Sequence, residues 1–592
     1  MNIRSILLFT VFVSYCHFSH AQEKSDIVWW NPTNHEFNVI EGQGWPEEIQ
    51  SGYDRLPEKA KGAVRTPVWD LSKHSAGLLI RFRSNAGNIV IRYQVDGGHA
   101  MPHMPATGVS GVDLYAKNSD GEWMWCRGNY SFGDTIKYNF QNINPNDTYH
   151  ELGREYHLYL PLYNSVKWLE IGVPENTLFR PTPVRQEKPI VVYGTSIAQG
   201  ACASRPGMAW TSILHRKMDR PLINLGFSGN GRLEPEVIDL LAEIDAKIYV
   251  LDCLPNLGPN LGFSLEEVYK RIISSVKRLR EKRSSTPILL IEHAGYADGV
   301  INSTRQSIYT NLNKTLQEAF TQLKAEGITN IHLLPKAAID MGMESYVDGT
   351  HPTDLGMMEY ATAYEQHLRE ILHEPMGTLS TTIPITQSRE PHNYDWEQRH
   401  QKLLTLNKTQ PPKICFFGNS ITHFWGGNPE APIRTGADSW DKYLEGLEVR
   451  NFGFGWDRVE NVLWRIYHDE LHGFKAEQIV VMLGTNNIHL NSDEEILLGL
   501  ELVIQAIQNR QPNARVSLIG LFPRKENEKR IHTLNLMIAQ LSANMNVHFV
   551  DIGKVLLNDQ GKINDLLFSD GLHPNAAGYH KLAPLLRDHL SR

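Results

Sequence analysis

The chain has few cysteines, no long apolar segment beyond its N-terminus and no large excess of charge. Its 592 residues include five cysteines, and one of these, Cys16, lies within an N-terminal apolar run. The remaining cysteines are too few for a disulfide scaffold in a protein of this size. A net charge of -8 gives no reason to expect binding to nucleic acid or anionic lipid. Because no later apolar stretch is long enough to cross a bilayer, we expect no stable membrane insertion.

One disulfide remains possible. Cys202 follows shortly after Ser196, and Cys253 lies at the end of a predicted strand in the same part of the chain. An oxidising compartment would permit a bridge between them, and the alternative is two buried free thiols.

The N-terminus has the features of a cleaved secretory signal. Met1 to Arg4 carries positive charge, the apolar run ILLFTVFV follows, and Ser19-His-Ala21 is a small-x-small cleavage site. These features predict a signal peptide over residues 1–21 and a soluble protein that is secreted or periplasmic. Lipid anchoring at Cys16 is the minority interpretation, because a tyrosine precedes it where lipoprotein signals need a small residue.

Three patterns of strands and helices divide the remaining sequence. Residues 22–186 contain short β runs separated by turn residues and no convincing amphipathic helix, which predicts a β-sandwich. Residues 187–375 alternate strands and helices, which predicts a parallel sheet covered on both faces. Residues 376–410 begin with a polar, Thr/Ser-rich segment and form a predicted linker and docking helix. The alternation restarts over residues 411–592. The predicted fold class is therefore multidomain, a β-sandwich followed by two flavodoxin-like α/β domains.

Two short motifs occur twice, in the same order and at nearly the same spacing. In each α/β region a serine follows the first strand, and an Asp-x-x-His segment comes near the end. The residues are Ser196, Asp348 and His351 in the first region, and Ser420, Asp570 and His573 in the second. A serine hydroxyl is a poor nucleophile unless a base removes its proton and an acid orients that base. The carboxyl end of a strand is where open α/β sheets build their sites.

These motifs resemble those of the SGNH (GDSL-like) hydrolases. The segments Tyr193-Gly-Thr-Ser-Ile197 and Phe417-Gly-Asn-Ser-Ile421 look like the first block of that family, and the two Asp-x-x-His-Pro segments look like the last. The segments Asn224-Leu-Gly-Phe-Ser-Gly229 and Asn451-Phe-Gly-Phe-Gly-Trp456 look like the Gly block, and Leu483-Gly-Thr-Asn486 looks like the Asn block. Upstream, Ser110-Gly-Val-Asp-Leu-Tyr115 resembles the β-sandwich found ahead of some bacterial SGNH domains.

The resemblance implies a role for each matching residue. The serines are the nucleophiles, the histidines the bases and the aspartates the orienting acids. The implied oxyanion-hole residues are Gly229 and Asn256 in the first domain, and Trp456 and Asn486 in the second.

Two of these oxyanion positions depart from the family pattern. Trp456 stands where the family usually has glycine; its indole either lines the substrate pocket, stacks on a sugar ring, or packs beneath the loop. The Asn block of the first domain is irregular, and Asn256 is the best candidate there. Thr195 and Asn419, where the family has Asp before Ser, are expected to tune the loop and not to perform the chemistry.

Other possible sites are weaker. His468 and His472 lie about one helical turn apart, but the glutamate of a zinc-binding H-E-x-x-H helix is missing, which favours a solvated helix end. His99 and His103 lie in a sandwich loop that either reaches the first site or is only structural. Phosphate-binding and dinucleotide-binding glycine motifs are absent. The sequence predicts neither a metal nor a cofactor.

The resemblance implies a carboxylic ester hydrolase that acts on an acylated poly- or oligosaccharide. Acetyl or other small acyl groups on a plant or algal polysaccharide are the expected substrate, an extension that rests on export, the β-sandwich and family analogy. One alternative is a lipid or platelet-activating-factor-like acetylhydrolase, which the second repeat resembles. Another is one active esterase domain beside a non-catalytic, glycan-binding domain. The sequence does not determine the oligomeric state.

Overall fold

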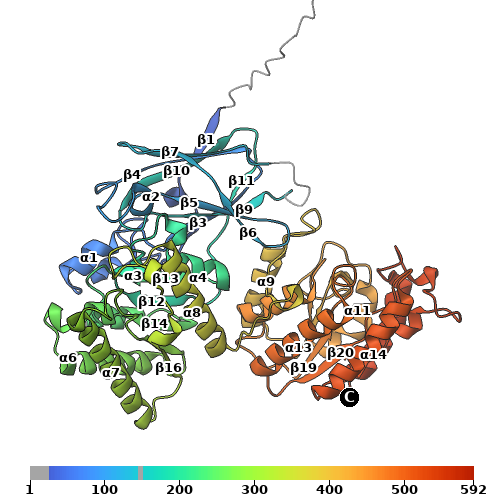
Figure 1. Cartoon of the computed structure of the whole chain (residues 1–592). Helices are drawn as coiled ribbons and strands as arrows, with labels where there is room; N and C mark the ends of the chain where they lie inside the picture. The colour runs from blue at the N-terminus through green and yellow to red at the C-terminus, as the bar shows by residue number, and fades with distance from the viewer. Residues whose placement is uncertain (1–25, 145–150) are drawn as a thin grey trace, which may run out of the picture.

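The structure is a computed structural model that describes residues 26–144 and 151–592. The predicted signal peptide, residues 1–21, lies outside the described residues. A region of antiparallel sheets comes first, and two α/β domains with parallel sheets follow it (Figure 1). The predicted multidomain fold class is confirmed.

The N-terminal region is a sandwich of two antiparallel sheets. The first sheet has the strand order β1-β10-β4-β8-β7, and the second has the order β11-β3-β9-β5-β6, with β2 beside β3. The first-sheet strands are β1 (Ile27–Trp30), β4 (Asn88–Val95), β7 (Asn129–Ser131), β8 (Ile136–Gln141) and β10 (Val166–Pro174). The second-sheet strands are β2 (Ile40–Glu41), β3 (Leu79–Ser84), β5 (Asp113–Lys117), β6 (Trp123–Cys126), β9 (Arg154–Tyr159) and β11 (Phe179–Pro181). Alternate side chains of both sheets, such as Phe82 and Ile91, share one core.

The sandwich region also contains short helices that the sequence pattern did not predict. Helix α1 (Thr66–Ser72) and helix α2 (Ala106–Val109) are each too short to give a clear helical period in the sequence. Val68 and Trp69 of α1 belong to the core of the first α/β domain, not to that of the sandwich. Packing against another domain therefore stabilises a helix that its local pattern does not predict.

The first α/β domain has a parallel sheet in the flavodoxin-like order β13-β12-β14-β15-β16. Its strands are β12 (Ile190–Gly194), β13 (Leu222–Gly226), β14 (Ile248–Asp252), β15 (Ile288–Ile291) and β16 (Ile331–Leu334). Its helices are α3 (Ser196–Gln199), α4 (Trp210–Met218), α5 (Pro235–Leu241), α6 (Leu265–Lys282), α7 (Ser303–Ala325) and α8 (Asp354–Leu372). Alternate strand residues enter two separate cores, one beneath α5, α6 and α7 and the other beneath α4 and α8. This two-sided burial explains the continuous apolar strands.

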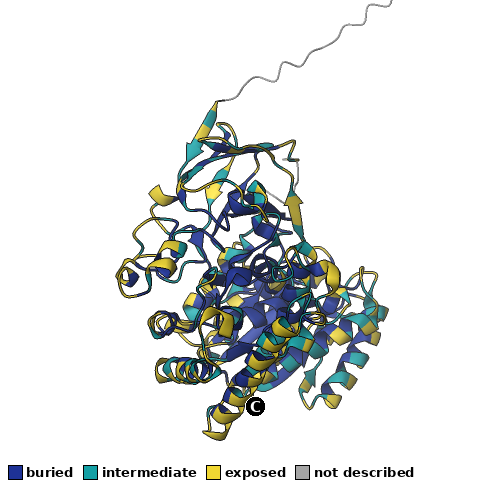
Figure 2. Cartoon of the chain, turned by 60° about the vertical axis from the view of Figure 1, so that its left-hand side comes forward, coloured by how far each residue is buried: buried dark blue, intermediate teal, exposed yellow. Residues whose placement is uncertain are grey.

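The second α/β domain repeats this topology, with the order β18-β17-β19-β20-β21. Its strands are β17 (Ile414–Gly418), β18 (Val449–Gly453), β19 (Gln478–Met482), β20 (Arg515–Ile519) and β21 (His548–Val550). Its helices are α10 (Ser420–His423), α11 (Ala437–Tyr443), α12 (Val459–Arg465), α13 (Asp493–Arg510), α14 (Glu528–Asn544) and α15 (Ala576–Leu590). Figure 2 shows the sheets as the buried interior and exposed residues on the outer faces of the helices.

The segment that joins the two α/β domains is packed, although its composition predicted a linker. Thr381 is fully buried and its hydroxyl donates to the Glu495 carbonyl oxygen at 2.6 Å. Helix α9 (Trp396–Thr409) follows, and its Trp396 and Leu403 belong to the core of the second domain. Residues before β17 therefore complete that domain.

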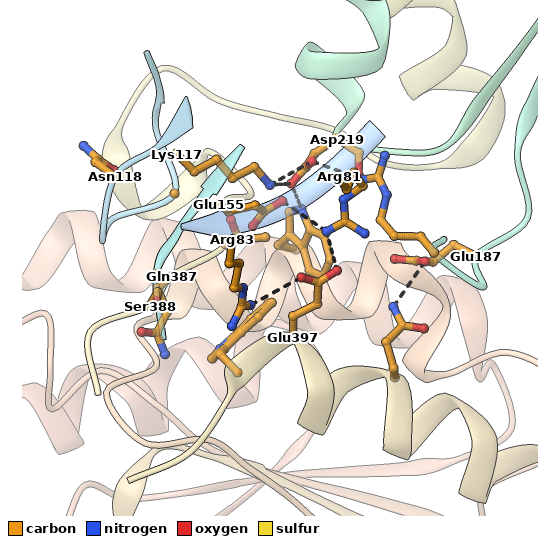
Figure 3. Close-up of a pocket in the computed structure, with 17 residues that line it drawn as sticks. Arg81, Arg83, Lys117, Asn118, Glu155, Glu187, Asp219, Gln387, Ser388 and Glu397 are labelled. Carbon is orange, nitrogen blue, oxygen red and sulfur yellow. Dashed lines mark hydrogen bonds and ion pairs between the residues drawn. The ribbon is translucent and has the colours of Figure 1, made fainter. Parts of the chain in front are cut away.

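A charge-balanced cluster joins the sandwich to both α/β domains (Figure 3). Arg81 of β3 donates to Glu397 of α9 at 2.5 Å. Lys117 of β5 and Arg185 both pair with Asp219, which follows α4. Because these side chains are buried, the ion pairs fix how the regions meet, provided that each charge keeps its partner.

A second set of buried ion pairs joins the two α/β domains directly. Arg220 and Lys247 of the first domain pair with Asp469 of the second, at 3.3 and 2.7 Å. The neighbouring His468 is 3% exposed and stacks on Trp464 with 3.6 Å between ring centroids. The expectation of a solvated helix end is therefore wrong for His468, because the segment lies in a domain interface.

The four cysteines among the described residues are free thiols, and Cys202, Cys253 and Cys415 are buried. The possible bridge between Cys202 and Cys253 is therefore not formed. Burial raises the pKa of the Cys202 thiol to about 12, so this group is uncharged at neutral pH. No helix among residues 26–144 and 151–592 is long and apolar enough to cross a membrane.

Asp252, at the end of β14, predicts a pH effect on stability. Burial raises its pKa to about 6, and a hydrogen bond from the Tyr364 hydroxyl at 2.9 Å offsets this only in part. The folded protein therefore holds this proton more tightly than the unfolded chain, whose reference pKa is 3.8. The contribution to stability is present below pH 3.8 and is lost as the pH rises through about 6.

Replacing Asp252 with asparagine should remove this dependence. Between pH 4 and pH 7.5, the free energy of unfolding of the wild type should fall by about 2 kcal/mol relative to Asp252→Asn. Urea denaturation of both proteins at the two pH values measures the difference. If the two proteins differ in stability by the same amount at both pH values, folding does not raise the pKa of the Asp252 carboxyl group.

Candidate active site

Each candidate nucleophile lies at the junction of the central strand and a short helix. Ser196 follows β12 and begins α3, and Ser420 follows β17 and begins α10. The preceding residues, Thr195 and Asn419, cap these helices by accepting hydrogen bonds from the backbone N–H two positions later. A capping role agrees with the expectation that these two positions shape the loop.

The Asp-x-x-His segments form tight loops that hold both side chains in place. Asp348 Oδ1 accepts from the N–H groups of Thr350 and His351, at 3.0 and 2.8 Å. Asp570 Oδ1 accepts from the N–H groups of Leu572 and His573, at 2.9 and 2.7 Å. In both loops the second carboxylate oxygen remains free for the imidazole.

The structure brings the three predicted residues of each site into one hydrogen-bonded chain. In the first domain, Ser196 Oγ lies 2.8 Å from His351 Nε2, and His351 Nδ1 lies 2.7 Å from Asp348 Oδ2. In the second domain, the Ser420 and His573 atoms lie 2.8 Å apart, and those of His573 and Asp570 lie 2.7 Å apart. This is the arrangement of a Ser-His-Asp triad, in which the carboxylate orients the base and the base contacts the hydroxyl.

Hydrogen bonding keeps both aspartates ionised. Burial alone would raise the pKa of Asp348, but the backbone and side-chain hydrogen bonds of His351 outweigh it and lower the pKa to about 2. The same causes lower the pKa of Asp570 through His573. Each imidazole therefore faces a negative charge across the pH range in which an imidazole acts as a base.

The Gly-block loops of the two sites have the same backbone shape. Gly229 and Trp456 both adopt left-handed backbone angles, with φ of 69° and 61°. In the part of the chain that the structure describes, neither of their N–H groups donates a hydrogen bond within the protein. The two positions therefore offer equivalent free donors, although one is glycine and the other is tryptophan.

The two Asn blocks are equivalent in register, although their sequences differ. Gly194 pairs with Asp252 and Gly418 pairs with Met482 in the sheets. Counted from these strand ends, Asn256 and Asn486 occupy the same position. Asn256 Oδ1 accepts from the Gly231 N–H at 3.2 Å, whereas Asn486 Nδ2 donates to the Asp457 carbonyl oxygen at 3.0 Å. Both amides are therefore anchored to the Gly-block loop of their own site.

Sequence reasoning missed the residues that anchor the Gly-block loops to the nucleophile helices. Gln199 Oε1 accepts from the Ser228 N–H at 3.0 Å, and His423 Nδ1 accepts from the Gly455 N–H at 3.1 Å. Each anchor lies three positions after its serine. This shared offset was a usable signal, but the two residue types differ.

The sandwich contributes to the first site. Tyr163 donates its hydroxyl hydrogen to the Ser196 carbonyl oxygen at 3.2 Å, and the rings of His103 and His351 lie 6.1 Å apart between centroids. A pocket of about 440 Å³ lies between the sandwich and the first α/β domain, lined by His74, Met101, His103, Tyr163, Ser228, Asn230 and His351, among others. The loop that carries His103 therefore reaches this site, whereas His99 lies beside Phe132.

The packed segment before α9 serves the second site in the corresponding way. Gln387 and Tyr394 both donate to the Gly455 carbonyl oxygen, at 2.9 and 2.7 Å. Arg389 donates to the Trp456 carbonyl oxygen at 3.3 Å. The Gly-block loop is therefore held from outside, and Trp456 remains 49% exposed. Of the interpretations weighed for this residue, packing beneath the loop is wrong.

The fold and the arrangement of these residues define an SGNH-type hydrolase. The GDSL-like lipase/acylhydrolase family matches residues 187–369 and again residues 416–581. The family described as the N-terminus of SGNH-hydrolase-type esterases matches residues 27–179. The chain belongs to the GDSL-like lipase/acylhydrolase family and contains two such domains in tandem behind a β-sandwich.

Similar proteins include mammalian enzymes and a bacterial protein of known structure. Platelet-activating factor acetylhydrolase IB subunit alpha2 of Rattus norvegicus is 31% identical over 198 residues, which cover 33% of this chain and 82% of the rat protein. Subunit alpha1 of Homo sapiens is 29% identical over 202 residues, which cover 33% of this chain and 83% of that protein. A crystal structure described as a GDSL-like lipase from Bacteroides ovatus is 32% identical, with a TM-score of 0.54, and covers 59% of this chain and 98% of its own.

Proposed function

We propose that this protein is a secreted serine esterase with two active sites, which removes acetyl or other small acyl groups from a poly- or oligosaccharide. The observation that carries the proposal is the duplicated Ser-His-Asp arrangement. In each copy the serine hydroxyl lies 2.8 Å from a histidine that is itself bonded to an aspartate. The sugar part of the proposal is supported by the predicted export signal and by the attached β-sandwich.

The proposed reaction is acyl transfer through the serine. The imidazole removes the hydroxyl proton of Ser196 or Ser420 as the oxygen attacks the ester carbonyl carbon. The negative charge that develops on the carbonyl oxygen is stabilised by the N–H of Gly229 or Trp456 and by the Asn256 or Asn486 amide. The imidazolium then protonates the departing alcohol, and an acyl-serine remains.

Water completes the cycle. The neutral histidine takes a proton from a water molecule, which attacks the acyl-serine, and the serine regains its hydrogen as the carboxylic acid departs. The orienting aspartate stays ionised throughout and holds the imidazole in the required tautomer. The pKa of about 2 at Asp348 favours this role.

Two other functions are favoured by specific observations. The likeness to platelet-activating factor acetylhydrolases supports a lipid acetylhydrolase that uses the same Ser-His-Asp residues. The irregular Asn block of the first domain supports a single active domain beside a glycan-binding one. Against the latter, Asn256 and Asn486 share one register position, which supports two active sites.

Serine variants test the proposal. Acetate release is measured from 4-nitrophenyl acetate and from a panel of acetylated polysaccharides, using wild type, Ser196→Ala, Ser420→Ala and the double variant. We expect each single variant to lose part of the activity and the double variant to lose all of it. Full activity of Ser196→Ala would make the first domain non-catalytic, and an active double variant would refute the serine mechanism.

The Asn-block amides predict a matched pair of effects. Asn256→Ala, measured in the Ser420→Ala background, should lower kcat at the first site by about 10²–10³-fold, as Asn486→Ala should at the second site. The reason is the loss of one donor to the developing oxyanion. Steady-state kinetics with 4-nitrophenyl acetate measure both effects. If Asn486→Ala lowers kcat at the second site but Asn256→Ala leaves kcat at the first site unchanged, the first site uses another donor.

A further inference from the structure

We propose that the Trp456 indole is a stacking platform for a pyranose ring of the substrate at the second active site. The inference rests on the proposed esterase function and adds a substrate contact to it. It assigns to the second site a feature that the first site lacks, because Gly229 occupies the corresponding position, where an added Cβ would meet nothing within 4 Å.

The backbone at Trp456 indicates that the side chain is retained for its own contacts. A φ of 61° suits glycine, and a bulky residue in this conformation is strained. The loop does not need the indole for its shape, because Gln387, Tyr394 and Arg389 hold its carbonyl groups. Strain of this kind concentrates at functional sites.

Within the described part of the chain, the indole has no stacking partner. Trp456 as a whole residue is 49% exposed, and among the described residues no other ring and no cationic side chain stacks on its indole. Trp396 and Trp464, which lie in the same domain, are instead buried in its core. An exposed indole on the residue whose own N–H is the candidate oxyanion donor is a surface for a ligand.

The surroundings of the indole favour a sugar over an acyl chain or a quaternary ammonium group. Arg458, two positions further along the chain, is polar and only partly buried, and the Asn486 amide is bonded to the same loop. A pyranose has an apolar C–H face bordered by hydroxyl groups, which suits one aromatic face with polar groups around it. A quaternary ammonium group is bound by several aromatic rings, and a long acyl chain needs a continuous apolar groove.

The test uses Trp456→Gly and Trp456→Phe in the Ser196→Ala background, in which only the second site turns over. The substrates are an acetylated oligosaccharide, 4-nitrophenyl acetate, 4-nitrophenyl octanoate and an acetyl ester with a phosphocholine headgroup. For Trp456→Gly we expect the KM for the oligosaccharide to rise about tenfold relative to the KM of the same variant for 4-nitrophenyl acetate, whereas any change in kcat that the two substrates share reports the oxyanion position and not the indole. Trp456→Phe should keep most of the affinity because it retains an aromatic face.

Stability separates this role from a structural one. Glycine relaxes the left-handed backbone, so the melting temperature of Trp456→Gly should not fall. A fall in melting temperature together with a loss on all four substrates would make Trp456 a structural residue and overturn the inference. A loss confined to the octanoate or to the phosphocholine ester would overturn it in favour of a lipid substrate.

Two results distinguish a failure of the proposed function from a failure of the stacking platform. If the Ser196→Ala protein hydrolyses 4-nitrophenyl acetate but no acetylated oligosaccharide, the carbohydrate esterase proposal fails for this site and the platform fails with it. If the oligosaccharide is hydrolysed with the same KM by Trp456→Gly, only the platform is wrong.

Discussion

Replacing His573 with alanine in the Ser196→Ala background should lower kcat by about 10⁴-fold or more, and His351→Ala in the Ser420→Ala background should do the same at the first site. Each imidazole contacts its serine hydroxyl at 2.8 Å and is the group placed to accept the proton. Without it the hydroxyl attacks the carbonyl as a neutral, weak nucleophile. Initial rates with 4-nitrophenyl acetate measure the loss.

Two controls make this result specific. His580 lies on α15 and pairs with Asp438 at the surface, so His580→Ala should leave the rate unchanged. Adding His573→Ala to the Ser196→Ala/Ser420→Ala protein should cost almost nothing further, because Ser420 and His573 act in one step. A Ser196→Ala/His573→Ala enzyme that keeps more than about one per cent of the Ser196→Ala activity would exclude this histidine as the general base.

The largest expected effect on stability comes from Arg185. Its guanidinium donates to Glu41 at 2.6 Å and to the Asp219 carbonyl oxygen at 2.7 Å, and it is buried where the sandwich meets the first α/β domain. Arg185→Met should lower the free energy of unfolding by about 3–5 kcal/mol, because it leaves the Glu41 carboxylate buried without its partner. Urea denaturation followed by fluorescence measures the change.

The partner variant shows whether the loss comes from the unpaired charge. Glu41→Gln added to Arg185→Met should recover part of the stability, since no buried carboxylate then remains uncompensated. Arg180→Met, at an exposed position of β11, is the matched control and should change stability by less than about 0.5 kcal/mol. A loss below about 1 kcal/mol in Arg185→Met would mean that water or another residue compensates Glu41.

The acid dependence of this pair follows from Glu41. Burial alone would raise its pKa, but Arg185 and His215 hold it well below the usual value of 4.5. A lowered pKa in the folded state contributes stability that is present above pH 4.5 and is lost only as the pH falls through the lower folded value. The Arg185→Met protein should lack this contribution near neutral pH.

The sequence alone determined the fold class and which three residues meet at the candidate site of each α/β domain. Strand-like apolar runs alternating with helices predict a covered parallel sheet, and the structure has this sheet twice. The Ser and Asp-x-x-His segments are local motifs whose backbone hydrogen bonds form within a few residues. Their pattern is therefore visible in sequence, and the distances of 2.8 and 2.7 Å at both sites agree with the predicted groupings.

Only the tertiary structure decided what surrounds those centres. His103 and Tyr163 come from the sandwich, and Gln387 and Tyr394 come from a segment whose composition suggested a linker. These contacts join residues that are far apart in the chain, and no local period or motif records such pairings. The burial of His468 and the free thiols of Cys202 and Cys253 were undecided or misjudged for the same reason. Local hydrogen bonding and hydrophobic period fix the elements and motifs, whereas packing between domains fixes which surfaces line each site.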